Sequence, residues 1–241
     1  MNSSRLLGRH WFSGKRSAGF ESTNMLMRFI RGEVGVEILL SWLIAVTVAI
    51  TVHEFAHAKS AELAGDSTPR RNGRVTLNPA AHYDMIGSTM FLLFGFGWAK
   101  PVPINPLAFK NPRRSTVLVS LWGPLSNFIT AALAALPLRL GALGADQPYG
   151  RMFLIIVFAN LMLGVFNLIP LGPLDGAHIL EGLLSDRANR ALGAFYQRNS
   201  RWLLLLVLAI FFIPALGNLV FGPIMIIVGI MTRLLTGGMG I

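Results

Sequence analysis

The stretch VGVEILLSWLIAVTVAITVHEFAHAKSAEL, residues 34–63, decides the fold. Its first two-thirds are almost entirely apolar, whereas its last third carries His53, Glu54 and His57. An α-helix rises 1.5 Å per residue, so about 20 apolar residues cross a hydrocarbon layer of about 30 Å. The stretch therefore predicts a membrane-spanning helix with a polar end, which the following Gly65 terminates.

The composition of the whole chain indicates the same environment. Of its 241 residues 53% are hydrophobic and 13% are charged, against roughly 45–50% and 25% in an average soluble domain. The mean hydropathy is +0.57. Charged side chains are absent from five stretches, 38–53, 85–99, 115–138, 152–174 and 202–232. These features exclude a water-soluble globule and predict an all-α polytopic membrane protein.

We expect one transmembrane domain over residues 34–241, with about four spans at 34–63, 115–138, 152–170 and 202–232. Pro214 and Pro223 interrupt the last stretch, because proline removes a helix hydrogen bond and clashes with the preceding turn. The sequence leaves open whether that stretch is one long kinked helix or two short ones.

Residues 70–106 predict a small membrane-associated region. Residues 70–79 contain an Asn72-Gly73 turn and favour a β-hairpin. Residues 85–98 are apolar but short and Gly-rich, which favours a re-entrant segment or a β element over a span. Non-helical backbone at that depth must be shielded by protein.

Residues 1–33 are predicted to be a basic N-terminal arm outside the fold, either disordered or a targeting segment. The first 24 residues are rich in Arg and Ser and carry one acid, Glu21. An upstream extension, with the true start at Met25 or Met27, is the alternative interpretation.

The net charge of +10 is best explained by loops that face anionic lipid. Lys and Arg are concentrated in the loops 59–74, 100–114 and 187–201. The positive-inside rule places such loops in the cytoplasm. We therefore expect a multi-pass protein of the cell membrane that contacts the lipid bilayer, and no nucleic-acid partner.

His53-Glu54-Phe55-Ala56-His57 is an H-E-x-x-H motif. At 3.6 residues per turn its two imidazoles lie on one face of the helix, where they can bind one zinc ion, and Glu54 can act as general base. Because a charge and two imidazoles within a hydrophobic helix are costly unless paired or metallated, the setting favours a real site. A solvated helix end beyond the membrane boundary is the alternative.

A catalytic zinc usually takes three protein ligands, and this chain has no cysteine. Asp175 fits the third position best, because it directly follows the charge-free stretch and a helix break. The alternative is that Asp175 caps a helix beginning near Gly176. The competing ligands are His82, Asp84, His178 and Glu181.

Two asparagines in apolar segments are further candidates. Asn127 and Asn167 could line a polar path for water, and Asn167 could instead donate to the oxyanion or to the substrate backbone. Hydrogen bonding between helices is an equally weighted interpretation of both. Gly123 is interpreted as a packing residue rather than a chemical one.

Five segments together are similar to the site-2 protease family (peptidase family M50) of intramembrane zinc metalloproteases, and most to compact members without a PDZ domain. They are HEFAHAKSAELAGD (53–66), LNPAAHYD (77–84), GWAKPVPINP (97–106), GPLSN (123–127) and NLIPLGPLDG (167–176). The resemblance implies that His53, His57 and Asp175 bind one Zn²⁺ per chain and that Glu54 is the catalytic base.

The resemblance also implies that the region 70–106 meets the substrate, a transmembrane segment of another protein. Cleavage would occur near the cytoplasmic face, in regulated intramembrane proteolysis. Two other functions stay open from the sequence: an inactive membrane scaffold of the same fold, and a divalent-metal transporter. Glu54 argues against both, because neither requires a general base.

Overall fold

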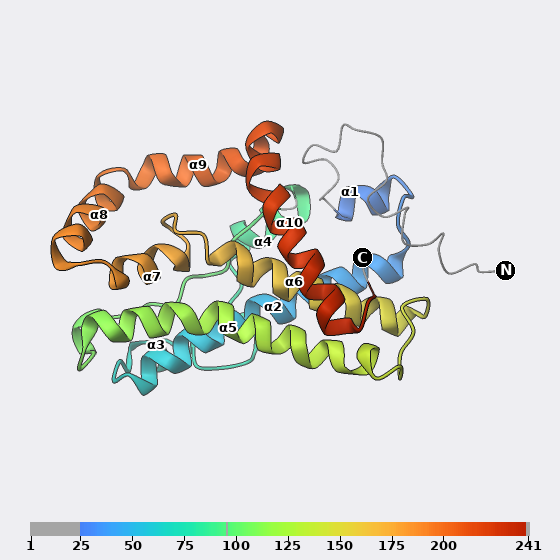
Figure 1. Cartoon of the computed structure of the whole chain (residues 1–241), viewed down its shortest axis with the longest axis horizontal. Coiled ribbons are helices and arrows are strands. Elements are labelled where there is room, and N and C mark those ends of the chain that lie inside the picture. Colours follow the sequence, from blue (N-terminus) through green and yellow to red (C-terminus); the bar gives the residue numbers. More distant parts are fainter. Residues whose placement is uncertain (1–24, 95, 240–241) are drawn as a thin grey trace.

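A computed structural model describes residues 25–94 and 96–239, and the regular elements assigned there are all helical (Figure 1). This confirms the all-α prediction. The elements are α1 (Met25–Ile30), α2 (Val36–Leu63), α3 (Thr68–Arg71), η4 (Pro79–Ala81), α4 (Met85–Phe94), η5 (Pro106–Ala108), α5 (Pro112–Arg139), α6 (Pro148–Asn167), α7 (Asp175–Leu183), α8 (Asp186–Arg198), α9 (Ser200–Phe212) and α10 (Pro214–Thr236).

Four helices, α2, α5, α6 and α10, are long and apolar enough to cross a membrane. With 28, 28, 20 and 23 residues, each reaches at least about 30 Å at 1.5 Å per residue. Helices α2, α5 and α6 match the first three predicted spans. By the length and composition of its helices, the chain is a multi-pass membrane protein.

The fourth predicted span, 202–232, is divided into two helices. Ile213 between them is extended, with φ −106° and ψ 108°, because the ring of a following proline disfavours the helical conformation. Pro214 then begins α10, where its missing N–H leaves no helix bond unmade. Helix α9 has 13 residues and is about 20 Å long, so the span is α10.

Helices α2, α5 and α6 pack side by side, and α10 crosses α6 (Figure 1). Small buried residues lie in the core of this bundle, namely Ala45 of α2 with Ala131 and Ala135 of α5. Val157 and Leu161 of α6 fill the space beside them and are fully buried. Small side chains let helix backbones approach closely, which is how helices associate in a lipid environment.

The β-hairpin expected in residues 70–106 is not present in the described part of that region. Two backbone carbonyls of this region accept hydrogen bonds from a side chain rather than from a neighbouring strand. Arg74, which is 2% exposed, donates from its guanidinium to Ala81 O at 2.6 Å and also to Lys100 O. The Arg74 guanidinium thus connects two carbonyls that are 19 residues apart in the sequence, and the region folds as loops around this buried cation.

The apolar stretch 85–99 begins with the helix α4. Its ten residues are about 15 Å long and too short to cross a membrane, as predicted. Asp84 Oδ1 accepts a hydrogen bond from Gly87 N at 2.8 Å at the start of α4. The chain then returns, and Ala99 forms an isolated antiparallel bridge with Tyr83.

The predicted N-terminal arm falls largely outside the described residues, which begin at Met25. The arm therefore stays a prediction over residues 1–24. Its described part begins with the helix α1, which contacts α2 and α4.

Asp66, just beyond the end of α2, fastens the long loop to the bundle. Its carboxylate is fully buried and accepts hydrogen bonds from Thr68 N at 2.9 Å and from Asn105 N at 2.7 Å. Burial by itself raises the pKa of Asp66, but these bonds outweigh it and hold the pKa below its ordinary value. The ionised form therefore stabilises the fold.

We expect Asp66→Asn to destabilise the protein by about 1–3 kcal/mol at pH 7, because an amide nitrogen cannot accept a bond from a backbone N–H. Thermal unfolding in detergent measures this loss. The stabilising effect of ionised Asp66 is fully present above a pH of about 4, the pKa of its carboxyl in the unfolded chain. It is lost as the pH falls towards the lower pKa of Asp66 in the folded protein.

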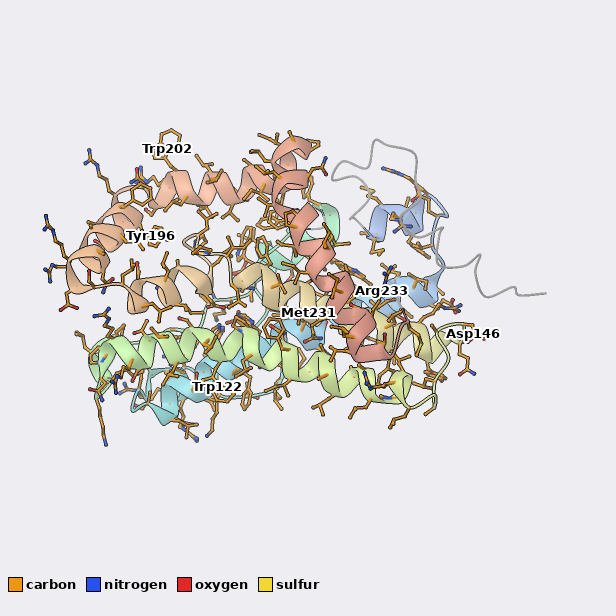
Figure 2. The ribbon with its side chains drawn as sticks, viewed as in Figure 1. Trp122, Asp146, Tyr196, Trp202, Met231 and Arg233 are labelled. Carbon is orange, nitrogen blue, oxygen red and sulfur yellow. The ribbon has the colours of Figure 1, made fainter. Side chains whose placement is uncertain are left out.

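The matched control for this prediction is Asp146→Asn. Asp146 is exposed at the opposite end of the bundle (Figure 2). An equal unfolding temperature for wild type and Asp66→Asn at pH 7 would contradict the structural role of Asp66.

Candidate metal centre

Helix α2 places two imidazoles on successive turns of one face. His53 Nε2 and His57 Nε2 are 3.0 Å apart, and the two rings are nearly perpendicular, with an interplanar angle of 85°. Both residues are buried, at 5% and 7% exposure. The spacing of four residues on a helix of 3.6 residues per turn produces this arrangement.

The carboxylate of Asp175 completes a cluster with these histidines. Asp175 Oδ2 is 3.1 Å from His53 Nε2, and Asp175 Oδ1 is 3.2 Å from His57 Nε2. Asp175 is the first residue of α7, and the N-cap position belongs to Leu174, which makes no side-chain cap. The alternative interpretation of Asp175 as a helix cap is therefore not supported.

The start of α7 is held close to the end of α6 by a glycine. A Cβ atom on Gly176 would lie 2.3 Å from Leu168 O and 2.4 Å from Ile169 O. Only a residue without a side chain fits against these carbonyls. The Pro- and Gly-rich segment after α6 thus turns Asp175 back onto the histidines of α2.

Each histidine has a hydrogen-bond acceptor at its other ring nitrogen. His53 Nδ1 is 2.8 Å from Asn127 Oδ1, and His57 Nδ1 is 2.8 Å from Val119 O. Because these oxygens can only accept, both Nδ1 atoms carry a proton. In the neutral form of the two imidazoles, the Nε2 lone pairs then point at each other and at Asp175.

This donor set fits a cation. Lone pairs 3.0 Å apart repel each other, and Asp175 Oδ2 is a buried atom that accepts no hydrogen bond. A tetrahedral zinc site with bonds of about 2.0–2.1 Å separates its ligand atoms by about 3.3 Å, close to the distances observed. Within the described residues, His53, His57 and Asp175 are the group with ligand atoms mutually within 4.8 Å.

Gly123 of α5 provides the space for both imidazoles. A Cβ atom at this position would lie 2.4 Å from His57 Nε2 and 2.8 Å from His53 Cε1. Gly123 is therefore a packing residue, as the sequence analysis interpreted it. Its packing partners are the two histidine rings of the metal centre, which the sequence did not indicate.

Glu54 lies beside the cluster on α2 and is partly exposed. Its carboxylate is close enough to interact electrostatically with His57 and with the buried Arg74 of the loop region. It forms no part of the His-His-Asp group, which leaves it available to exchange protons.

The competing ligands considered from the sequence lie elsewhere. His82 is buried in the loop, where its Nε2 is 2.8 Å from Thr76 O. Asp84 bonds to the start of α4. His178 and Glu181 interact with each other on α7, with 3.4 Å between Nδ1 and Oε2.

The two candidate asparagines differ in their surroundings. Asn127 contacts His53, and its Nδ2 donates to Asn160 Oδ1 at 3.0 Å. Asn167 Nδ2 donates to Leu163 O of its own helix at 3.0 Å. The sequence analysis missed Asn160, although a carboxamide in a charge-free span is itself a signal.

Comparison with known proteins agrees with this geometry. The model of the peptidase family M50 matches residues 142–213, which include Asp175. No solved structure matches the chain significantly.

Related proteins extend the similarity to most of the chain. "Putative zinc metalloprotease YwhC" of Bacillus subtilis is 39% identical over 191 residues, which cover 76% of this chain and 84% of the relative. "Putative zinc metalloprotease Rip2" of Mycobacterium tuberculosis is 32% identical over 198 residues, covering 79% and 72%. On this evidence the chain belongs to peptidase family M50, the site-2 protease family, and is a zinc metalloprotease of that family.

Proposed function

We propose that the protein is an intramembrane endopeptidase that hydrolyses a peptide bond within or near a transmembrane segment of another membrane protein. The observation that carries the proposal is the His53, His57 and Asp175 cluster, buried in a bundle of apolar helices with Glu54 beside it. Such an enzyme would act in regulated intramembrane proteolysis.

His53, His57 and Asp175 would hold one zinc ion through their Nε2 and carboxylate atoms. A zinc ion bound there would supply a Lewis acid and would lower the pKa of water from its bulk value towards about 7. The fixed Nδ1 protons of both histidines orient their Nε2 lone pairs and keep the site assembled.

Glu54 would move the proton in this reaction. Its carboxylate takes a proton from the attacking water, whose oxygen bonds to the carbonyl carbon of the substrate. The same carboxyl group then delivers the proton to the leaving nitrogen as the C–N bond breaks. The products are a new carboxyl end and a new amino end of the substrate. Asn167 stays a candidate for binding substrate backbone near this step.

The position of the cluster along α2 supports cleavage close to one membrane face. His53 lies 17 residues after Val36, or about 26 Å along the helix. The same end of the bundle carries the basic segments 59–74, 100–114 and 187–201, which include α3 and most of α8 (Figure 1). The positive-inside rule assigns these segments to the cytoplasm. We therefore place the active site near the cytoplasmic face of the cell membrane.

An apolar cavity supports access by a transmembrane segment. It has a volume of about 920 Å³ and lies between α2, α4, α6, α9 and α10. Ile50, one turn before His53, and Val46 line it from α2. On its edge the returning chain at Ala99 contacts Tyr83. A substrate helix must unwind before hydrolysis, and this extended segment gives the unwound strand a place to pair.

We expect Glu54→Gln to slow cleavage of a transmembrane reporter in liposomes by on the order of 10²–10⁴-fold, because a carboxamide cannot accept the proton. Its bound zinc, measured by metal analysis, should equal that of wild type. Asp175→Asn serves as the contrasting variant, since it should lose zinc as well as activity. Wild-type cleavage by Glu54→Gln would refute the proposed mechanism.

Gly123→Ala should weaken zinc retention by tenfold or more, because the new methyl group occupies the space of the His57 and His53 rings. Competition with a chelator measures this effect. Gly222→Ala in α10 is the matched control, since nothing lies within 4 Å of its added Cβ. Both changes improve helix propensity by about 1 kcal/mol, so equal zinc retention in the two variants would contradict the packing argument.

Filling the cavity should separate access from chemistry. Val46→Trp is expected to slow cleavage of a transmembrane reporter while leaving zinc content and hydrolysis of a short soluble peptide unchanged, because the added ring blocks the apolar route. Leu40→Trp on the same helix is the control, since Leu40 is exposed and does not line the cavity. An unchanged rate for the membrane reporter would count against this route.

A further inference from the structure

A buried hydrogen-bond chain runs from α6 to the metal centre through α5. Asn160 of α6 and Asn127 of α5 are both fully buried. Asn160 Oδ1 accepts from Asn127 Nδ2 at 3.0 Å, and Asn127 Oδ1 accepts from His53 Nδ1 at 2.8 Å. The hydrogen bonds of Asn160 go to Asn127 and to Ile156 O, so its hydrogen-bonded link to the metal centre passes through Asn127.

Each amide in this chain has a single satisfactory orientation. Asn160 Nδ2 donates to Ile156 O at 2.9 Å, and Asn127 Nδ2 donates to Ala49 O at 2.9 Å. Since a carbonyl oxygen can only accept, these atoms must be the NH₂ groups. Each Oδ1 then faces the next donor along the chain. His53 Nδ1 must therefore carry the proton, which leaves the Nε2 lone pair free.

The two histidines differ in what fixes them. His57 Nδ1 donates to Val119 O, a backbone oxygen that cannot rotate away. His53 Nδ1 donates to the side chain of Asn127, and that amide can turn. If it turned, its NH₂ group would face Nδ1 of His53 and favour the tautomer with the proton on Nε2. That tautomer has no lone pair on Nε2 and cannot bind a metal through this atom.

We propose that Asn160 is a positioning residue of the metal centre: through Asn127 it holds His53 in the tautomer and orientation that bind the ion. The inference rests on the proposed role of His53 as a ligand. Asn160 supplies one of the two acceptors for Asn127 Nδ2, and the other is Ala49 O. Without Asn160, one amide proton of Asn127 has no acceptor in the apolar span. The observed orientation of Asn127 then has one hydrogen bond fewer to stabilise it, so the turned orientation costs less free energy relative to it.

The test uses the full chain, purified in detergent with its zinc, and measures the rate of zinc loss to a chelator. Asn160→Leu and the smaller Asn160→Ala should both lose zinc several-fold to tenfold faster than wild type. Asn160→Asp, which restores the acceptor when its carboxyl is neutral, should lose zinc more slowly than either. The visible spectrum of the cobalt-substituted protein should change in Asn160→Leu, because it reports ligand geometry.

Ser126→Ala separates positioning from general loosening of the bundle. Ser126, one residue before Asn127 in the sequence, lies between α5 and α2. Its single hydroxyl proton is shared between Gly123 O of its own helix at 2.6 Å and Val52 O of α2 at 3.2 Å. This variant should retain zinc and the wild-type cobalt spectrum. Zinc loss as fast as that of Asn160→Leu would overturn the proposal, and so would wild-type retention by both Asn160→Leu and Asn160→Ala.

His53→Ala distinguishes this inference from the proposed function. Loss of zinc from His53→Ala, together with wild-type retention by Asn160→Leu, would refute the role of Asn160 and leave the ligand assignment standing. Undiminished zinc in His53→Ala would refute the ligand assignment itself, and the role of Asn160 with it.

Discussion

The central constraint on this structure is that two imidazole lone pairs and a carboxylate converge in an apolar bundle with little water to solvate them. The atoms of His53, His57 and Asp175 lie 3.0–3.2 Å apart, a costly arrangement without a cation between them. Nearby features serve this convergence. Gly123 leaves room for the rings, and the break after α6 returns the carboxylate to α2. A carboxamide and a backbone carbonyl hold the outer ring nitrogens.

The parts of this arrangement that depend on local periodicity could be predicted from the sequence. Charge-free stretches longer than a membrane thickness locate spans, because the bilayer selects for apolar length. His53 and His57 share a helix face because they are four residues apart. Asp175 could be predicted as a ligand because an acidic side chain directly after an apolar stretch and a helix break costs free energy unless it is paired or binds a metal. All three side chains lie together in the structure.

The parts that depend on distant partners could not be predicted. The expected hairpin is replaced by loops because Arg74 bonds to Lys100 O and Asp66 to Asn105 N, both far away in the sequence, and no local pattern predicts such bonds. Asn160 is visible as a polar residue in a span, but its partner on another helix is not. The division at Pro214 stayed open because a kinked helix and two helices satisfy the same hydropathy.

The metal-binding groups are unequally distributed along the chain, and this affects how the protein is made. His53 and His57 lie on adjacent turns of one helix, whereas Asp175 follows 118 residues after His57. A nascent chain therefore inserts α2 with its glutamate and histidines long before Asp175 is synthesised. Until α7 docks, the centre lacks its carboxylate. The order of synthesis thus delays assembly of the cluster until α2, α5 and α6 have all been made.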